Sequence, residues 1–167
     1  EIDAKNMYAI IEPYVSNAQV AAEAMKRGLI SGTPEAGAQA SHLAGHTFQS
    51  VWGIGYRTGI GFRNMLGFEW VLPTGELLRI GALSQSNAGW SWGEGPGPDL
   101  RGMLRAFVGV VGGLGMVTRM AVKLHPWPGP KIFPCEGRVP NQTSVLPKEK
   151  FEWILFRYRT LEDCVKV

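Results

Sequence analysis

The stretch AFVGVVGGLGMVTRMAVKLHP, residues Ala106–Pro126, is the one around which the rest of this chain is built. Its second half, Met116–Leu124, alternates between two sets of residues with a period of two, which predicts a strand with one buried face. Glycine adopts a positive φ without steric cost and lets other groups approach its backbone closely. The glycines before the strand are therefore typical both of a sharp turn and of a backbone cradle for a ligand, and these residues alone favour neither. Four glycines lie there: Gly109, Gly112, Gly113 and Gly115.

Upstream of this stretch, local signals predict a strand followed by a helix. Met7–Pro13 is a β-prone run ended by proline. Ser16 and Gln19 have the spacing of a capping box, which begins a helix that Gly28 can end in a left-handed conformation. Leu29–Arg63 is rich in glycine, serine and threonine and is expected to be a long, functional loop.

Further elements are predicted on either side of the glycines. Gly67–Gly81 contains two apolar runs joined by a Pro-Thr-Gly turn, which indicates a β-hairpin. Asp99 can cap a helix with an apolar stripe. Phe151–Arg159 alternates as a strand does, and Leu161–Val167 is expected to begin a helix. The stripe consists of Leu100, Met103, Leu104 and Phe107.

Composition excludes several classes of protein. The net charge is +3, but the 17 lysines and arginines are scattered, which argues against a nucleic-acid binder. The sequence has no apolar run long enough for a transmembrane segment and no signal peptide at its start, so a cytoplasmic protein is expected. Cys135 and Cys164 are too far apart for a metal motif and are expected to be reduced thiols. The chain starts with Glu1 and is expected to be part of a longer protein.

Two sets of polar residues are candidates for chemistry. His42 and His46 have the i, i+4 spacing of metal ligands on a helix, but no glutamate follows His42 and the flanking glycines disfavour a helix, so no metal site is expected. Glu35 follows Pro34 in the glycine-rich segment, where a carboxylate could reach a pocket and act as a base. The alternative for Glu35 is a solvated loop acid.

Four segments, in this order along the chain, resemble those of one family. They are Ile2–Gly28 with Glu12-Pro13-Tyr14-Val15, Ser41–Tyr56 with Gly45 and Gly53-Ile54-Gly55-Tyr56, the hairpin Val71–Gly81, and Gly97–Pro126 with Gly115-Met116-Val117-Thr118. Together they resemble the second lobe of the FAD-binding domain in the vanillyl-alcohol oxidase and p-cresol methylhydroxylase (PCMH) superfamily, which includes glycolate- and D-lactate-type FAD-linked dehydrogenases.

The resemblance implies an α+β fold, with an antiparallel-rich sheet and flanking helices. Residues 1–128 would form the second lobe of a PCMH-type FAD-binding domain, and residues 129–167 would begin an α+β cap domain. The implied activity is the oxidation of an alcohol, phenol or 2-hydroxy acid by hydride transfer to FAD, with Glu35 as a base or orienting group. The implied FAD contacts are Pro34, Ser41, His42, Gly45, His46, Thr47, Gly53, Gly55, Tyr56, Gly113, Gly115, Met116, Val117 and Thr118.

The sequence departs from the family pattern in what it lacks. The first lobe of the family carries a glycine-rich R-x-G-G-x-S/T loop for the pyrophosphate, and this chain contains no such motif. The resemblance therefore implies partners: the first lobe and the rest of the cap, in the same or another chain, a small-molecule substrate, and an oligomer. We expect that the 167-residue chain alone does not hold FAD. The alternative is a non-catalytic, flavoprotein-like scaffold or subunit of a larger complex.

Overall fold

The structure is a computed structural model of the 167-residue chain. It describes residues 1–32, 37–47, 58–59, 61–93, 100–104, 113–138, 141, 143–149, 152 and 154–165. The chain divides into two compact units, Glu1–Ile132 and Phe133–Val167. The first unit contains the large sheet and every candidate site residue that the structure describes.

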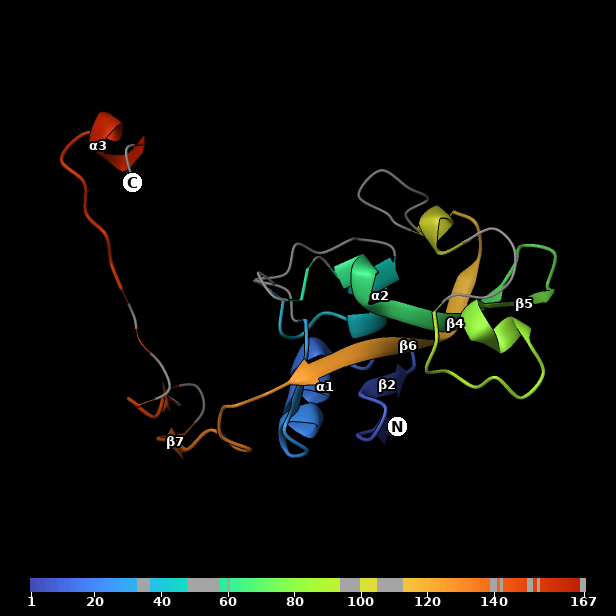
Figure 1. Cartoon of the computed structure of the whole chain (residues 1–167), viewed down its shortest axis with the longest axis horizontal. Helices are drawn as coiled ribbons and strands as arrows, with labels where there is room; N and C mark the ends of the chain where they lie inside the picture. The colour runs from blue at the N-terminus through green and yellow to red at the C-terminus, as the bar shows by residue number, and fades with distance from the viewer. Residues whose placement is uncertain are drawn as a thin grey trace. The chain divides into compact units, whose positions relative to one another are not determined.

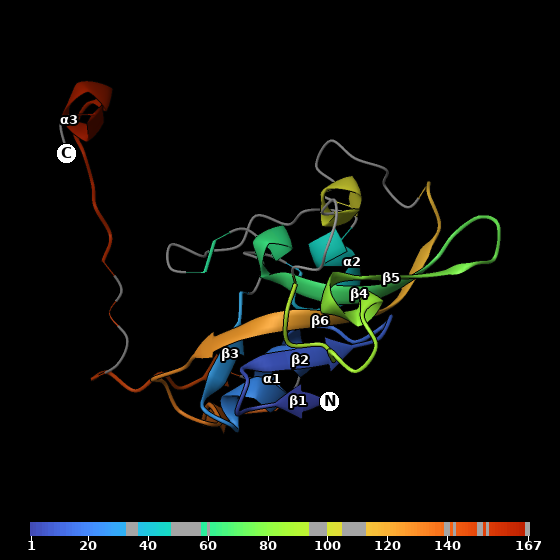
Figure 2. The ribbon, with the colours of Figure 1, turned by 45° about the vertical axis from the view of Figure 1, so that its right-hand side comes forward.

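An antiparallel sheet organises the first unit, with β6 at its centre (Figures 1 and 2). The strands lie in the order β1-β2-β6-β4-β5, and β3 pairs with the far end of β6. All strand pairs in this sheet are antiparallel, which confirms the predicted antiparallel-rich α+β fold. The strands are β1 (Ile2–Asp3), β2 (Tyr8–Ile11), β3 (Leu29–Ser31), β4 (Met65–Val71), β5 (Leu77–Ile80) and β6 (Met116–Pro126).

Short helices connect and cover these strands. The first, α1, begins as predicted: Ser16 Oγ accepts from the Gln19 N–H at 3.3 Å, and Gln19 Oε1 accepts from the Ser16 N–H at 2.8 Å. Gly28 follows the helix with a φ of +72°, a conformation that glycine adopts most easily. The helices of this unit are α1 (Asn17–Met25), α2 (His42–Thr47) and the 3₁₀ helices η1 (Gly61–Asn64), η2 (Gly81–Ser84) and η3 (Leu100–Leu104).

A bulge in β6 changes which of its side chains face the core. Glu69 of β4 pairs with Arg119, whereas the next residue, Trp70, pairs with Val117, so Thr118 is an extra residue on β6. Val117 is consequently buried. The alternation predicted for Met116–Leu124 places Val117 and Arg119 on the same face of the strand. This prediction was wrong, because an extra residue in β6 interrupts the period of two.

One face of the sheet carries the hydrophobic core, and α1 and α2 both contribute to it. Each large apolar side chain buried in such a core contributes about 1.5 to 3 kcal/mol relative to exposure. The cluster thus fixes α1 and α2 against the sheet. Its members are Ala9, Ile11, Val20, Ala24, Leu29, Leu43, Met65, Phe68, Trp70, Ile80, Val117, Met120, Val122 and Leu124.

Several sequence predictions were wrong about the segments between these strands. Leu29–Arg63 is not a continuous loop, since its described part contains β3, α2 and most of η1. The doubt about a helix through His42 and His46 was also wrong: α2 includes Gly45 because its buried contacts offset the helix cost of one glycine, about 1 kcal/mol. Over Leu100–Leu104 the predicted α-helix is the 3₁₀ helix η3, which has Gly102 at its centre.

The second unit contains only small elements among its described residues. Two two-residue strands, β7 (Cys135–Glu136) and β8 (Thr143–Ser144), form one ladder, and α3 spans Leu161–Val165. Residues 154–159 do not form the predicted strand, because within the described part of the chain no partner strand satisfies their backbone groups.

Candidate functional site

The structure describes two groups of the predicted FAD contacts. The first group is Ser41 and α2, and the second is the turn and strand start from Gly113 to Thr118. The two groups pack against the same hydrophobic core, because α2 contacts β6 and Leu43 packs in the same cluster as Val117. The remaining predicted site residues lie outside the described part of the chain: Pro34, Glu35, Gly53, Gly55 and Tyr56.

Backbone contacts with the start of α1 position the first group. Ser41 forms an antiparallel bridge with the helix cap Ser16, and the His42 N–H donates to the Val15 carbonyl oxygen at 2.8 Å. At the other end of α2, the Thr47 hydroxyl donates to the Leu43 carbonyl oxygen at 2.8 Å. The hydroxyl group of Thr47 therefore already has a hydrogen-bond partner within its own helix. The start of α2 is held by hydrogen bonding to the turn Glu12-Pro13-Tyr14-Val15.

Asn17, the first residue of α1, fixes the tautomer of His42. Its Nδ2 group donates to the Gly37 carbonyl oxygen at 2.9 Å, which leaves the acceptor Oδ1 facing His42 Nδ1 at 2.7 Å. Since Oδ1 can only accept, Nδ1 of His42 carries the proton, and Nε2 of the neutral ring keeps a lone pair. The sequence analysis missed Asn17, because its partners are 20 and 25 residues away.

His46 has the same tautomer for a similar reason. Its Nδ1 donates to the His42 carbonyl oxygen at 2.8 Å, and the two imidazole rings lie 4.1 Å apart between centroids, tilted by 33°. Burial, together with the charge that His46 would carry, lowers the pKa of His42 well below its usual value, and burial lowers the pKa of His46. Both rings are consequently neutral at pH 7, and both Nε2 atoms are buried without a hydrogen-bond partner among the residues that the structure describes.

This pair of histidines accepts hydrogen bonds and does not neutralise negative charge. An unpaired buried acceptor costs about 1 to 3 kcal/mol, which a hydroxyl or N–H donor would offset. A phosphate oxygen would meet a lone pair instead and be repelled. The pair therefore fits the hydroxyl or N–H groups of a ligand, and not a pyrophosphate.

The second group begins at Gly115, whose conformation is explained by packing. Its φ is +124°, and a Cβ at this position would overlap the Val71 carbonyl oxygen and lie 2.7 Å from Trp70 Nε1. The end of β4 thus requires a residue without a side chain here. Of the two interpretations of the glycine stretch, the tight turn accounts for Gly115.

One edge of β6 beyond this turn is open. β4 pairs with β6 from Met116 to Val122, whereas β2 pairs with the other edge only from Met120 to Lys123. In the part of the chain that the structure describes, no strand pairs with residues 116–119 on the β2 side. Main-chain donors and acceptors on this edge need partners, and a ligand could supply them.

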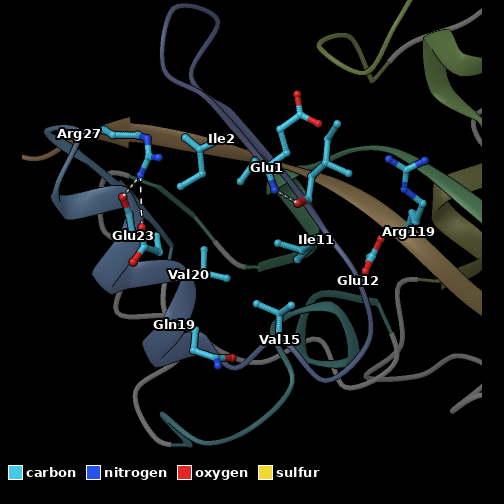
Figure 3. Close-up of a pocket in the computed structure, with 12 residues that line it drawn as sticks. Glu1, Ile2, Ile11, Glu12, Val15, Gln19, Val20, Glu23, Arg27 and Arg119 are labelled. Carbon is cyan, nitrogen blue, oxygen red and sulfur yellow. Dashed lines mark hydrogen bonds and ion pairs between the residues drawn. The ribbon is translucent and has the colours of Figure 1, made fainter.

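A cleft of about 410 Å³ leads towards this open edge. It lies between α1 and the strands β1 and β2, and Figure 3 shows Ile2, Ile11, Val15 and Val20 around it. Arg119, at the end of the open edge, also lines the cleft, past the end of β2. The sequence did not predict this cleft, because its walls come from three separate segments.

Comparisons with known proteins show which proteins share this fold. No family model matches the sequence. The chain is similar to the glycolate oxidase subunit GlcD of Bacillus subtilis (strain 168), with 29% identity over 133 residues, 78% of this chain and 26% of that protein. The solved structure of p-cresol methylhydroxylase with substrate bound matches with 27% identity and a TM-score of 0.64, over 77% of this chain and 24% of its own. The chain is thus similar in sequence and fold to members of the vanillyl-alcohol oxidase and p-cresol methylhydroxylase superfamily.

Two further structures of the superfamily share the fold. The 4-ethylphenol oxidase from Gulosibacter chungangensis, in complex with isoeugenol, matches at 24% identity and a TM-score of 0.63, over 75% of this chain and 23% of its own. The 6-hydroxy-D-nicotine oxidase from Arthrobacter nicotinovorans matches at 23% identity and a TM-score of 0.58, over 75% and 24%. The superfamily consists of FAD-linked oxidases and dehydrogenases. The chain spans about a quarter of the length of the relatives it matches.

The described residues contain neither a membrane-spanning helix nor a metal-binding cluster. No described helix is long and apolar enough to cross a bilayer. Among the residues that the structure places, no three His, Cys, Asp or Glu side chains gather as a metal centre requires. The histidine pair of α2 therefore has no third described ligand near it.

Proposed function

We propose that this chain is part of an FAD-dependent oxidoreductase that oxidises an alcohol, a phenol or a 2-hydroxy acid by hydride transfer to the flavin. Residues 1–128 would form the second lobe of the FAD-binding domain, and residues 129–167 would begin the cap domain. The observation that carries the proposal is the open edge of β6 at the end of the cleft, on the fold of this superfamily.

The described residues fit the uncharged parts of FAD. The open edge of β6 can hydrogen-bond the edge of an adenine ring through main-chain groups near Val117. His42 and His46 can accept from hydroxyl or N–H groups of the cofactor. When bound, the flavin supplies the hydride chemistry, while the protein supplies position and electrostatics.

The same residues do not provide for the pyrophosphate. Neither Ser41–Thr47 nor Gly113–Thr118 contains a lysine or arginine, and both histidines of the first segment are neutral. Charge neutralisation would have to come from outside these two segments, and we assign it to the first lobe, in the same or a partner chain. This need supports the proposal that the functional unit is larger than this sequence. We further propose that it is an oligomer acting on a small-molecule substrate.

We predict that the 167-residue chain alone retains no stoichiometric FAD after gel filtration, because only one wall of the cradle is present. The complete flavoprotein should elute with its flavin, as measured by absorbance. Stoichiometric flavin on the isolated chain would contradict the prediction. A complete assembly that binds no flavin would instead favour the second candidate, a non-catalytic scaffold or subunit.

We predict that Glu35→Gln in the complete enzyme slows flavin reduction by about 100-fold or more, the usual contribution of a general base. Stopped-flow absorbance of the flavin measures this rate. Glu76→Gln is the matched control, since Glu76 is exposed in the turn between β4 and β5, does not line the cleft, and accepts a hydrogen bond from the Thr74 hydroxyl. An unchanged reductive rate in Glu35→Gln would leave this residue as a solvated loop acid.

A cytoplasmic location is part of the proposal. Cys135 and Cys164 are both free and exposed, as expected for thiols in a reducing compartment. Fractionation of cells that express the complete protein, with thiol labelling of both cysteines, would test the location.

A further inference from the structure

The sheet face opposite α1 and α2 contains a charged hollow, whose described lining shares only Arg119 with the cleft of the proposed function. Phe68 and Trp70 point into the core, so Glu69 between them points to the other face. There a hollow of about 540 Å³ lies over β4, β5 and β6 and is closed on one side by residues 83–90. We call it the outer hollow.

Three charged side chains from adjacent strands form the floor of the outer hollow. Glu69 is in register with both Arg79 of β5 and Arg119 of β6. Its Oε1 lies 3.3 Å from Arg79 Nε, and its Oε2 lies 3.9 Å from Arg119 Nη1. Two cations share one carboxylate, so the cluster retains one positive charge.

Arg119 is the member of this cluster whose donors are least used. The 3.9 Å contact with Glu69 is an ion pair but too long for a hydrogen bond. Its Nε–H is buried and has no acceptor in the described part of the chain, which costs about 1 to 3 kcal/mol. The guanidinium lies 4.9 Å from the centre of the Trp90 ring, a cation–π contact that restricts its orientation.

The walls of the outer hollow suit a small organic ligand. Leu77 and Leu83 are apolar, and the indole of Trp90 offers a flat face. Asn87 adopts a left-handed backbone with φ of +68° in the polar rim. The volume lies in the range of ligand pockets, about 300 to 1,000 Å³. The polar rim consists of Ser84, Gln85, Ser86 and Asn87.

We propose that the outer hollow binds a small organic oxyanion, a carboxylate or a phosphate ester. Its oxygens accept hydrogen bonds from Arg119 and Arg79, because guanidinium groups match the geometry of both anions. Its apolar part lies against Trp90 and Leu77. The anion supplies the acceptor that Arg119 Nε lacks and balances the surplus charge of the cluster.

Titration of the full chain with benzoate and with inorganic phosphate, at constant ionic strength, tests this site by calorimetry and tryptophan fluorescence. We expect saturable binding that Arg119→Gln and Arg79→Gln each weaken by roughly ten-fold, as expected when a charged hydrogen bond is lost. Glu69→Gln should tighten binding, because it frees both arginines. Arg27→Gln, at an exposed arginine that follows α1, is the matched control and should have no effect.

The two probes also separate the two anion types. Tighter binding of benzoate assigns a carboxylate with an apolar body, and tighter binding of phosphate assigns a phosphate ester. No saturable signal beyond that of chloride overturns the proposal, as does binding that is equal in wild type and Arg119→Gln. If Arg119→Gln does not fold, the binding affinity of Arg79→Gln tests the proposal instead. Arg79 is largely exposed, so its replacement should not disturb the fold. None of these readouts involves flavin, so this proposal and the proposed function fail separately.

Discussion

Replacing Gly115 by alanine is expected to destabilise the first unit by about 3 kcal/mol or more. A positive φ at a non-glycine residue costs about 1 to 3 kcal/mol. The new Cβ would also overlap the Val71 carbonyl oxygen at the end of β4, and such overpacking costs about 1 to 3 kcal/mol. Urea unfolding followed by circular dichroism gives the free energy of unfolding of the variant and the wild type.

Gly75→Ala separates the two contributions. Gly75, in the turn between β4 and β5, has a similar φ of +87°, but no heavy atom lies within 4 Å of its ideal Cβ position. Gly75→Ala should therefore lose only the backbone term, and Gly115→Ala should lose clearly more. Equal losses in the two variants would show that close packing against β4 does not explain Gly115.

The sequence could predict the turn at Gly115 but not its cause. The glycines and the alternation after them are local signals, and the strand begins at Met116 as predicted. The deciding contacts are with Trp70 and Val71 at the end of β4 and with Leu72 directly after it. No pattern within Ala106–Pro126 reveals that neighbour, so the turn and the ligand cradle could not be told apart.

Other correct predictions have the same local origin. The capping box of Ser16 and Gln19 involves two residues of one turn, and the β4–β5 hairpin is determined by its tight turn. Both signals are complete within a few residues. Both predictions were confirmed because neither element needs contacts with distant residues to form.

The missed elements depend on distant partners. β3 has three residues and obtains its pairing from the far end of β6, and α2 is shorter than an isolated helix could be. The geometry of the candidate site likewise depends on residues that are distant in the sequence. The sequence named His42 and His46, but their tautomers are set by Asn17 and by the fold of α2.

The histidine pair also makes stability depend on pH. The pKa of each imidazole is lowered in the folded chain by burial, and for His42 also by its neighbour, from an unfolded value near 6.5. Above pH 6.5 both states bind no proton there, and the folded chain keeps its full stability. Below pH 6.5 the unfolded chain takes up protons that the folded chain cannot, so stability falls by up to about 1.4 kcal/mol per pH unit for each histidine.

We therefore expect the urea midpoint to fall steeply between pH 6.5 and pH 5, before most carboxylates titrate. His42→Gln and His46→Gln should each flatten this dependence, although both start from lower stability at pH 8. His125→Gln is the comparison. The pKa of His125 is lowered by burial and by Lys123, but this ring is only half-buried and its Nε2–H donates to Asn64 Oδ1 at 3.0 Å, so its share of the slope is smaller. A double variant of His42 and His46 that keeps the wild-type slope would show that the two rings take up protons in the folded chain. In that case they could neutralise a phosphate, and the assignment of α2 to the uncharged part of FAD would be wrong.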